Sequence, residues 1–169
     1  MDVKTLLVPV DFGEPSEAAL SYAVELAEKI GARLVVMHAY ELPVYGFPDG
    51  ALVASADVAA RVMAGAQAGL DGMVERFRGR ARLDTVLRQG IAWEEVRSVC
   101  EEVHADMIIM GTHGRTGLAR ALIGSVTEKV IRTSNKPVLT IHVPSDGHGH
   151  QRTYKAPASS SMPESPVRK

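Results

Sequence analysis

The residues best suited to chemistry lie in one stretch, from position 107 to 127, where glycines follow an apolar run. Two residues separate Gly111 from Gly114, nine separate Gly114 from Gly124, and Ser125 comes next. The pattern predicts a strand, a loop and a helix that begins at Ser125. This arrangement suits a phosphate group, because backbone N–H groups and the positive end of the helix dipole point into the loop. Glycine also lets a ligand approach the backbone closely.

The same spacing allows a purely structural interpretation. Ser125 and Glu128 have the spacing of a capping box, in which the serine hydroxyl only satisfies its own helix. Gly111 and Gly117 would then be turn residues. The loop is not a Walker A loop, since no lysine precedes Ser125, and its glycine spacing differs from the dinucleotide fingerprint. The residues alone leave nucleotide binding and a structural loop both open.

Composition narrows the classes of partner. The chain has 169 residues and a net charge of −1, so it carries no basic field that would attract nucleic acid or an anionic membrane. It has no apolar run near the ~18 residues of a membrane span, and its first residues do not read as a secretion signal. Cys100 is the single cysteine, which favours a reducing compartment. We expect a cytoplasmic protein with no nucleic-acid or membrane partner.

Apolar runs alternate with helical periodicities along most of the chain, which predicts an α/β fold. The sheet is expected to be open and mostly parallel, with helices on both faces, as in Rossmann-like proteins. Ser16 is the expected N-cap of the first helix. The expected strands are residues 5–10, 34–39, 82–87, 107–110 and 138–143, and the expected helices are residues 16–30, 57–77, 93–103 and 125–134.

Two segments break this pattern. Residues 41–56 contain two prolines and two glycines and are expected to form a long loop within a domain of residues 1–144. Residues 145–169 are rich in Ser, Pro and His, which predicts a disordered tail. His148 and His150 in this tail are read as solvated side chains, and no metal site is predicted. Arginine occupies every second position from 76 to 82, and this run is interpreted as a solvated helix end or as a contact for an acidic partner.

The expected topology brings several small or polar residues to one place. In open parallel sheets, ligands bind at the carboxyl ends of the strands, where the strand order reverses. Asp11, Ala39, Gly90 and Gly111 follow the first four expected strands. We therefore expect all four residues at one edge of the sheet.

Four segments of the chain resemble the universal stress protein family. They are LLVPVDFGEPSEAAL near the N-terminus, Gly90-Ile91-Ala92, the run from Ala105 to Gly111, and GTHGRTGLARALIGSVTEKVIRTSNKPVLTIHV, which fits G-x2-G-x9-G-[ST] at every fixed position. The resemblance covers residues 5–143. It implies a five-stranded sheet in the order 3-2-1-4-5 and the class of the family that binds ATP. It also implies a homodimer in which the fifth strands, from Val138 to Val143, pair across a two-fold axis.

The resemblance also implies a set of nucleotide contacts. Pro9 and Asp11 match first-strand positions, with Asp11 accepting hydrogen bonds from the ribose or the adenine edge, and Ala39 takes a place where relatives often have Val against adenine. Gly13 departs from the small hydroxyl residue common there. The other matched positions are Met110 and Gly111 beside the ribose, His113, Gly114 and Arg115 at the triphosphate turn, and Gly124, Ser125, Val126 and Thr127 at the helix N-terminus.

The leading hypothesis is an ATP-binding, dimeric stress-response switch with an unknown protein partner. ADP and AMP are alternative ligands, and Mg²⁺ would be held through the phosphates. No catalytic residue is assigned, because no base for attack on a γ-phosphate is evident. One alternative is a slow ATPase or nucleotidyl-transfer enzyme assisted by His113 or Asp11. Another is a nucleotide-free interaction or dimerisation module.

Overall fold

The central element is β1 (Thr5–Pro9), which pairs with a parallel strand on each side. A computed structural model of the protein describes residues 2–43, 55–112 and 123–143. Leu6, Leu7 and Val8 are fully buried. A continuous apolar run fits this place, because helices cover both faces of the sheet and leave no solvent-facing side.

The sheet has five parallel strands in the order β3-β2-β1-β4-β5, so the predicted fold and strand order are confirmed. Each strand is followed by a helix until β5 is reached. The remaining bounds are α1 (Glu14–Ile30), β2 (Arg33–Tyr40), α2 (Ala56–Glu75), β3 (Leu83–Gln89), α3 (Ala92–Glu102), β4 (Met107–Gly111), α4 (Ser125–Thr133) and β5 (Val138–Ile141). None of the helices in the described ranges combines the length and apolar character that a bilayer crossing requires.

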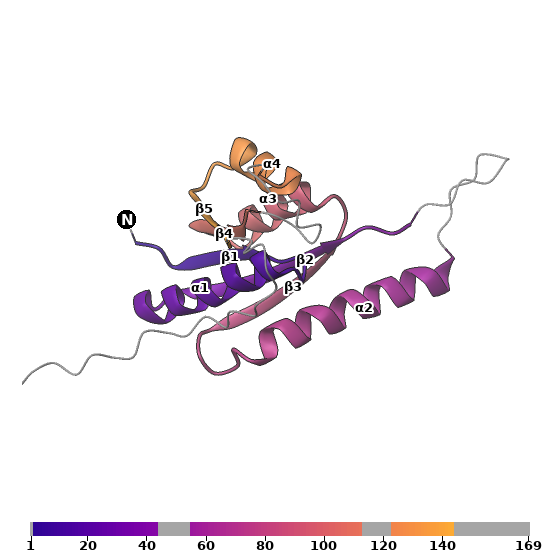
Figure 1. Cartoon of the computed structure of the whole chain (residues 1–169), viewed down its shortest axis with the longest axis horizontal. Coiled ribbons are helices and arrows are strands. Elements are labelled where there is room, and N and C mark those ends of the chain that lie inside the picture. The colour runs from indigo at the N-terminus through magenta and orange to yellow at the C-terminus, as the bar shows by residue number, and fades with distance from the viewer. Residues whose placement is uncertain (1, 44–54, 113–122, 144–169) are drawn as a thin grey trace, which may run out of the picture.

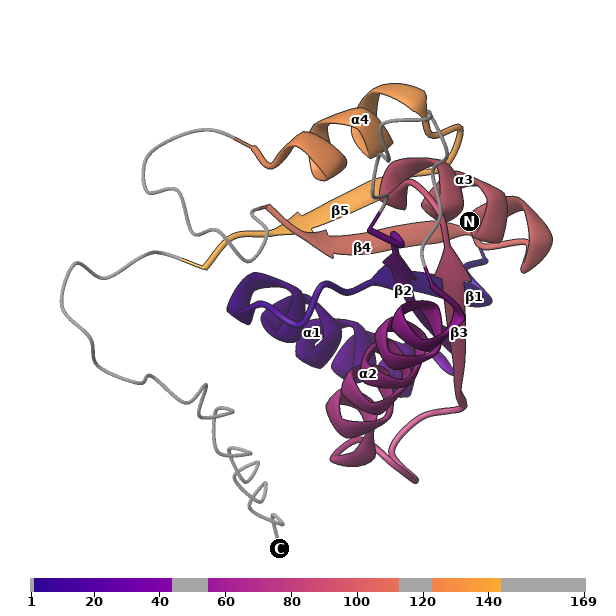
Figure 2. The ribbon, with the colours of Figure 1, turned by 90° about the vertical axis from the view of Figure 1, so that its right-hand side faces the viewer.

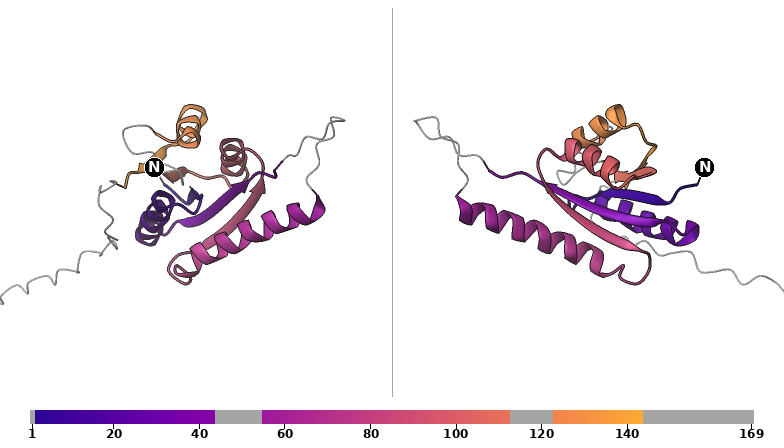
Figure 3. Two further views of the ribbon diagram at one scale, coloured as in Figure 1. Left: turned by 45° about the vertical axis from the view of Figure 1, so that its right-hand side comes forward. Right: turned by 180° about the vertical axis from the view of Figure 1, so that it is seen from behind.

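Helices α1 and α2 cover one face of the sheet, and α3 and α4 cover the other (Figures 1 and 3). Alternate side chains of β2 supply the two cores: Leu34 and Val36 pack beneath α1 and α2, whereas Val35 and Met37 pack beneath α3 and α4. The period-two geometry of a strand explains this division. Strand order reverses at β1, because the chain builds outward to β2 and β3 and then to β4 and β5.

Two helix starts differ from the sequence prediction. The N-cap of α1 is Gly13, whereas Ser16 lies within the first turn and is buried. Helix α2 begins at Ala56, and the side chain of Ser55 caps it by accepting a hydrogen bond from the Val58 N–H at 3.3 Å. The expected loop at 41–56 therefore overlaps the start of a helix. Its central residues 44–54 lie outside the described residues, as does the expected disordered tail from 144 onward.

Two arginines of the run that follows α2 form ion pairs with glutamates of the same chain. Arg80 donates two hydrogen bonds to the Glu28 carboxylate, at 3.0 and 2.7 Å, and Arg76 pairs with Glu17. Both glutamates belong to α1. The two pairs therefore connect the C-terminal end of α2 to α1, and an external acidic partner is not needed to explain these two arginines.

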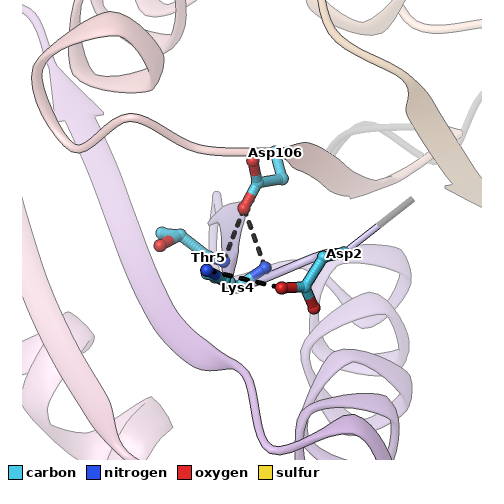
Figure 4. A network of polar contacts seen from close by, with 4 residues as sticks. All are labelled: Asp2, Lys4, Thr5 and Asp106. Atoms are coloured by element: carbon cyan, nitrogen blue, oxygen red, sulfur yellow. Dashed lines mark hydrogen bonds and ion pairs between the residues drawn. The ribbon is translucent and has the colours of Figure 1, made fainter.

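Asp106 joins the starts of β1 and β4 (Figure 4). Its Oδ2 atom accepts hydrogen bonds from the backbone N–H groups of Lys4, at 2.8 Å, and Thr5, at 3.0 Å. These hydrogen bonds, the one from Lys4 first, lower the pKa of the Asp106 carboxyl below its ordinary value. The charged carboxylate is therefore the form that holds the two strand starts together.

We expect Asp106→Asn to remove a pH-dependent part of the stability. Because the folded-state pKa is lowered, the contribution is present above the ordinary pKa of about 3.9 and is lost as pH falls through the lower folded value. Urea unfolding should show wild type more stable than the variant near neutral pH, with the difference shrinking below about pH 4. Asp2→Asn, at an exposed carboxylate, is the control. A difference independent of pH would contradict the prediction.

Candidate functional site

A cavity of about 200 Å³ opens at the carboxyl ends of β1, β2 and β4, beside the start of α4. It lies at the point of strand reversal, where ligands bind in open parallel sheets. Its described lining residues are Pro9, Val10, Asp11, Ser16, Met37, His38, Ala39, Ala92, Val96, Met110, Gly111, Gly124, Ser125, Val126 and Thr127.

Every predicted contact residue that the structure describes lines this cavity. These residues are Pro9, Asp11, Ala39, Met110, Gly111, Gly124, Ser125, Val126 and Thr127. His113, Gly114 and Arg115 lie outside the described residues. The structure thus brings the candidates together, and their roles as ligand contacts stay predictions. Gly90 is not among the described lining residues, and Ala92 of the following helix is found there instead.

Asp11 lies in the connection between β1 and α1, and the first turn of α1 fixes it. Its Oδ1 atom accepts a hydrogen bond from the Gly13 N–H at 3.1 Å, as in an Asx turn. Its own N–H donates to Ser16 Oγ at 3.3 Å, and that hydroxyl donates to the Gly13 carbonyl oxygen at 2.9 Å. The turn needs a left-handed residue, Phe12, with φ of 65°. Asp11 is therefore held at the cavity by a closed set of local hydrogen bonds.

The start of α4 forms the polar end of the cavity. Gly124 is the N-cap, no side chain caps the helix, and Ser125 is the first helical residue and is exposed. The predicted capping box is therefore wrong, and Glu128 instead accepts a hydrogen bond from Arg132 at 3.0 Å. Backbone N–H groups of a first helical turn have no partner within the helix. Together with the dipole, they favour an anion at this end.

Two hydrogen bonds join the ends of the segment between β4 and α4. The buried Thr127 hydroxyl donates to the Gly111 carbonyl oxygen at 2.9 Å, and the Gly124 N–H donates to the Thr112 carbonyl oxygen at 2.7 Å. We predicted Thr127 as part of the phosphate-holding turn. Its hydroxyl closes the base of the loop, and its role as a ligand contact stays a prediction.

The other walls of the cavity are largely apolar. Met37 and Ala39 follow each other on one face of β2, and Ala92 and Val96 are one helical turn apart on α3. Sequence analysis missed Val10, Ser16, Met37, His38, Ala92 and Val96 as lining residues. The period-two spacing from Ala39 would have indicated Met37. No local pattern indicates Ala92, because its place depends on how α3 crosses the sheet.

Gly111 permits a close approach between β4 and α1. A Cβ atom on this residue would lie 2.7 Å from the carbonyl carbon of Pro15 and 2.8 Å from its oxygen. The third close atom is Pro15 Cβ, also at 2.8 Å. Two of the three are backbone and the third belongs to the proline ring, so none can rotate away as a flexible side chain could. The first turn of α1, which holds Asp11, therefore packs directly on the end of β4.

We expect Gly111→Ala to lower the free energy of unfolding by about 1–3 kcal/mol, the usual cost of overpacking. Gly72→Ala is the matched control, because a Cβ there meets no atom within 4 Å. In an exposed helical position, that change should stabilise by up to about 1 kcal/mol. Urea denaturation would measure both variants, and equal stabilities for the two would contradict the prediction.

Two observations on the described residues concern metal binding and nucleophilic chemistry. No group of three or more His, Cys, Asp or Glu side chains in the described ranges is placed to hold a metal ion. Cys100 belongs to α3, where its side chain is buried, and this burial raises the pKa of the thiol. A buried neutral thiol is a poor nucleophile. The cavity itself combines an apolar wall with the polar start of α4.

These features define a doubly wound α/β protein with a small-molecule cavity at its point of strand reversal. The sequence profile of the Universal stress protein family matches residues 2–142. The chain belongs to that family.

Several universal stress proteins are similar to this chain over most of their length. The chain is 33% identical to a universal stress protein of Thermus aquaticus, over 82% of this chain and 98% of the relative. It is 29% identical to universal stress protein MJ0531 of Methanocaldococcus jannaschii, over 83% of each. Among solved structures, MJ0577 superposes with a TM-score of 0.72 at 25% identity, over 85% of this chain and 99% of that one. A universal stress protein in complex with cAMP superposes with a TM-score of 0.63 at 26% identity, over 84% and 99%.

Proposed function

We propose that this protein binds ATP and acts as a dimeric, nucleotide-dependent switch in a stress response. The observation that carries the proposal is the convergence on one cavity of Asp11, the apolar wall around Ala39 and the open N-terminus of α4. A nucleotide has an aromatic base, a polar sugar and an anionic phosphate group. The apolar wall suits the base, Asp11 suits the sugar hydroxyls, and the N-terminus of α4 suits the phosphate.

A structural relative supports the choice of an adenine nucleotide. The universal stress protein solved in complex with cAMP is 26% identical and covers 84% of this chain. In the proposed arrangement, adenine lies against the apolar wall, Asp11 accepts hydrogen bonds from the ribose, and the first turn of α4 receives phosphate. The same surfaces suit ADP and AMP, so the number of phosphates bound is part of the test.

Magnesium would enter with the phosphates. The described residues supply no cluster of acidic or histidine side chains that could hold the ion by themselves. Mg²⁺ commonly keeps several waters and binds through phosphate oxygens with few protein ligands. Mg-ATP is therefore the proposed ligand.

We propose binding without fast turnover. Asp11 and His38 are the titratable residues among the described lining residues, and both make hydrogen bonds to backbone groups of the β1–α1 connection. A general base must lie within reach of the proton that it removes. We assign Asp11 to the ribose hydroxyls and His38 to the Val10 carbonyl oxygen, and so assign neither to the attack on the γ-phosphate. The rival hypothesis, a slow ATPase or nucleotidyl-transfer enzyme, differs in forming a product from bound ATP.

Gly124→Val tests the phosphate end directly. Gly124 has φ of −57° and ψ of 145°, which a branched residue can adopt, so the variant should fold. Its side chain would project at the helix start where phosphate is expected. Calorimetric titration with Mg-ATP should show affinity lower by about tenfold or more, equivalent to about 1.4 kcal/mol. Gly72→Val, the same change at a helical glycine with open space around it, should bind as wild type.

Mass spectrometry of the same samples separates the alternatives. Intact ATP recovered after incubation supports a switch, while turnover faster than about one per second would place the protein among ordinary enzymes. If wild type neither carries nucleotide after purification nor binds added Mg-ATP, the nucleotide proposal fails. The interaction-module hypothesis would then replace it.

The proposed dimer uses the open edge of β5. This strand pairs with β4 on one side. The carbonyl oxygens of Pro137 and Ile141 accept hydrogen bonds from the N–H groups of Ile108 and Thr112, so every second residue of the strand directs its backbone groups toward β4. The N–H and C=O groups of Thr140 therefore face the open edge. An unpaired edge is a template for another strand, which supports pairing between the segments 138–143 of two chains.

We expect Thr140→Pro to weaken the dimer, since proline removes one edge donor without removing a bond to β4. Light scattering at micromolar concentration should give a dimer for wild type and a smaller average mass for the variant. Thermal unfolding would confirm that the variant is folded. A wild-type monomer would remove the proposal, and an undisturbed variant dimer would place the interface elsewhere.

A further inference from the structure

A stack of residues beside the cavity connects α2 to Asp11; of its members, His38 also lines the cavity. The rings of Phe12 and His38 lie 4.2 Å apart between centroids, with an interplanar angle of 38°. The same Phe12 ring reaches Gly69 of α2, where an added Cβ would lie 3.0–3.2 Å from three of its carbon atoms. Phe12 directly follows Asp11, so the packing of its ring affects the turn that carries the carboxylate.

His38 fixes the point at which the chain leaves the sheet. Pairing of β1 with β2 ends at Pro9, and the Val10 N–H makes one more ladder bond, to the Met37 carbonyl oxygen at 2.8 Å. The Val10 carbonyl oxygen then lies 2.7 Å from His38 Nδ1. A carbonyl only accepts, so Nδ1 carries the proton and donates it. In a continued parallel ladder, a backbone N–H of β2 would take this place.

The imidazole thus ends the ladder one residue before Asp11. The chain turns away through the left-handed Phe12, and the Asp11 carboxylate meets the Gly13 N–H. A side chain that supplies the last bond of a ladder also determines the direction in which the next residue departs.

Gly69 gives α2 direct contact with this turn. Gly65 and Gly72 on the same helix have no atom within 4 Å of an added Cβ, so the close contact is specific to Gly69. The arginine pairs described above fix the C-terminal end of α2 to α1, and the two helices share one face of the sheet (Figure 2). No α2 residue is among the described lining residues of the cavity.

We propose that Gly69, Phe12 and His38 form a positioning stack through which α2 sets the place of Asp11 and thereby the affinity for nucleotide. The proposal rests on the nucleotide-binding function for its effect on affinity, although the mechanical link exists without ligand. A displacement of α2, a helix that does not line the cavity, changes binding because the Phe12 ring transmits it to the β1–α1 turn.

Gly69→Val against Gly72→Val is the central comparison. Both place the same branched side chain in the same helix, so their helix propensities change alike. Only the first displaces Phe12. Titration with Mg-ATP should give affinity about 5- to 10-fold lower for Gly69→Val than for Gly72→Val, within the range of couplings carried by packed side chains.

Two substitutions of His38 test the hydrogen bond from its Nδ1 atom to the Val10 carbonyl oxygen: one removes the donor and the other replaces it. His38→Leu leaves the Val10 carbonyl without its donor and should weaken binding about as much as Gly69→Val. His38→Asn keeps an N–H donor near the Nδ1 position and should restore most of the affinity. If His38 acts through Asp11, His38→Leu should have little further effect in an Asp11→Ala background, since positions acting on one group are not additive. Equal effects in both backgrounds would overturn the proposal.

A ligand-free measurement separates this inference from the proposed function. In NMR spectra without nucleotide, Gly69→Val should shift the amide signals of Asp11 and Gly13, and Gly72→Val should leave them in place. If wild type binds no nucleotide, the proposed function fails, and the amide shifts alone decide whether the link exists. If wild type binds and Gly69→Val changes neither affinity nor the amide signals, the inference is overturned while the function stands.

Discussion

The contact between Gly111 and Pro15 is the constraint on which the site depends. It brings the end of β4 against the first turn of α1 with no side chain between them. The Gly111 carbonyl oxygen accepts the hydrogen bond that holds α4, while the first turn of α1 holds Asp11. Two halves of the cavity that are distant in sequence therefore meet at one glycine.

The rest of the sheet keeps this contact in place through burial. The central side chains of β1 and β2, residues 6–8 and 34–37, are fully buried on both faces, and the residues under each pair of helices belong to separate cores. Close packing on both sides transmits small displacements, because protein interiors have few voids to absorb them. A helix on one face can for this reason influence residues that line a cavity at the end of the sheet.

Sequence periodicity predicted the alternating strands and helices and placed Asp11 and Gly111 at strand ends, whereas the strand order came from the family resemblance. The sequence pattern was misleading at serines near helix starts, because serine is found both at the N-cap and within the first helical turn. Ser16 and Ser125 both have the chemistry of a helix cap, yet glycines take the N-cap position in both helices. Ala92 and the contact of Gly69 with Phe12 could not be predicted, because they depend on how helices cross the sheet and not on any local spacing.

The polar side chains around the cavity are used mainly to shape its backbone. The hydroxyls of Ser16 and Thr127 donate to carbonyl oxygens, and the imidazole of His38 donates to that of Val10. What such a site presents to a ligand is then largely the first turn of α4 and an apolar wall. A site built from backbone groups and small apolar side chains tolerates extensive sequence change. It depends on the conformation of the backbone and not on a particular side-chain functional group. This is in keeping with a fold that MJ0577 shares with this chain, at a TM-score of 0.72, although only 25% of their residues are identical.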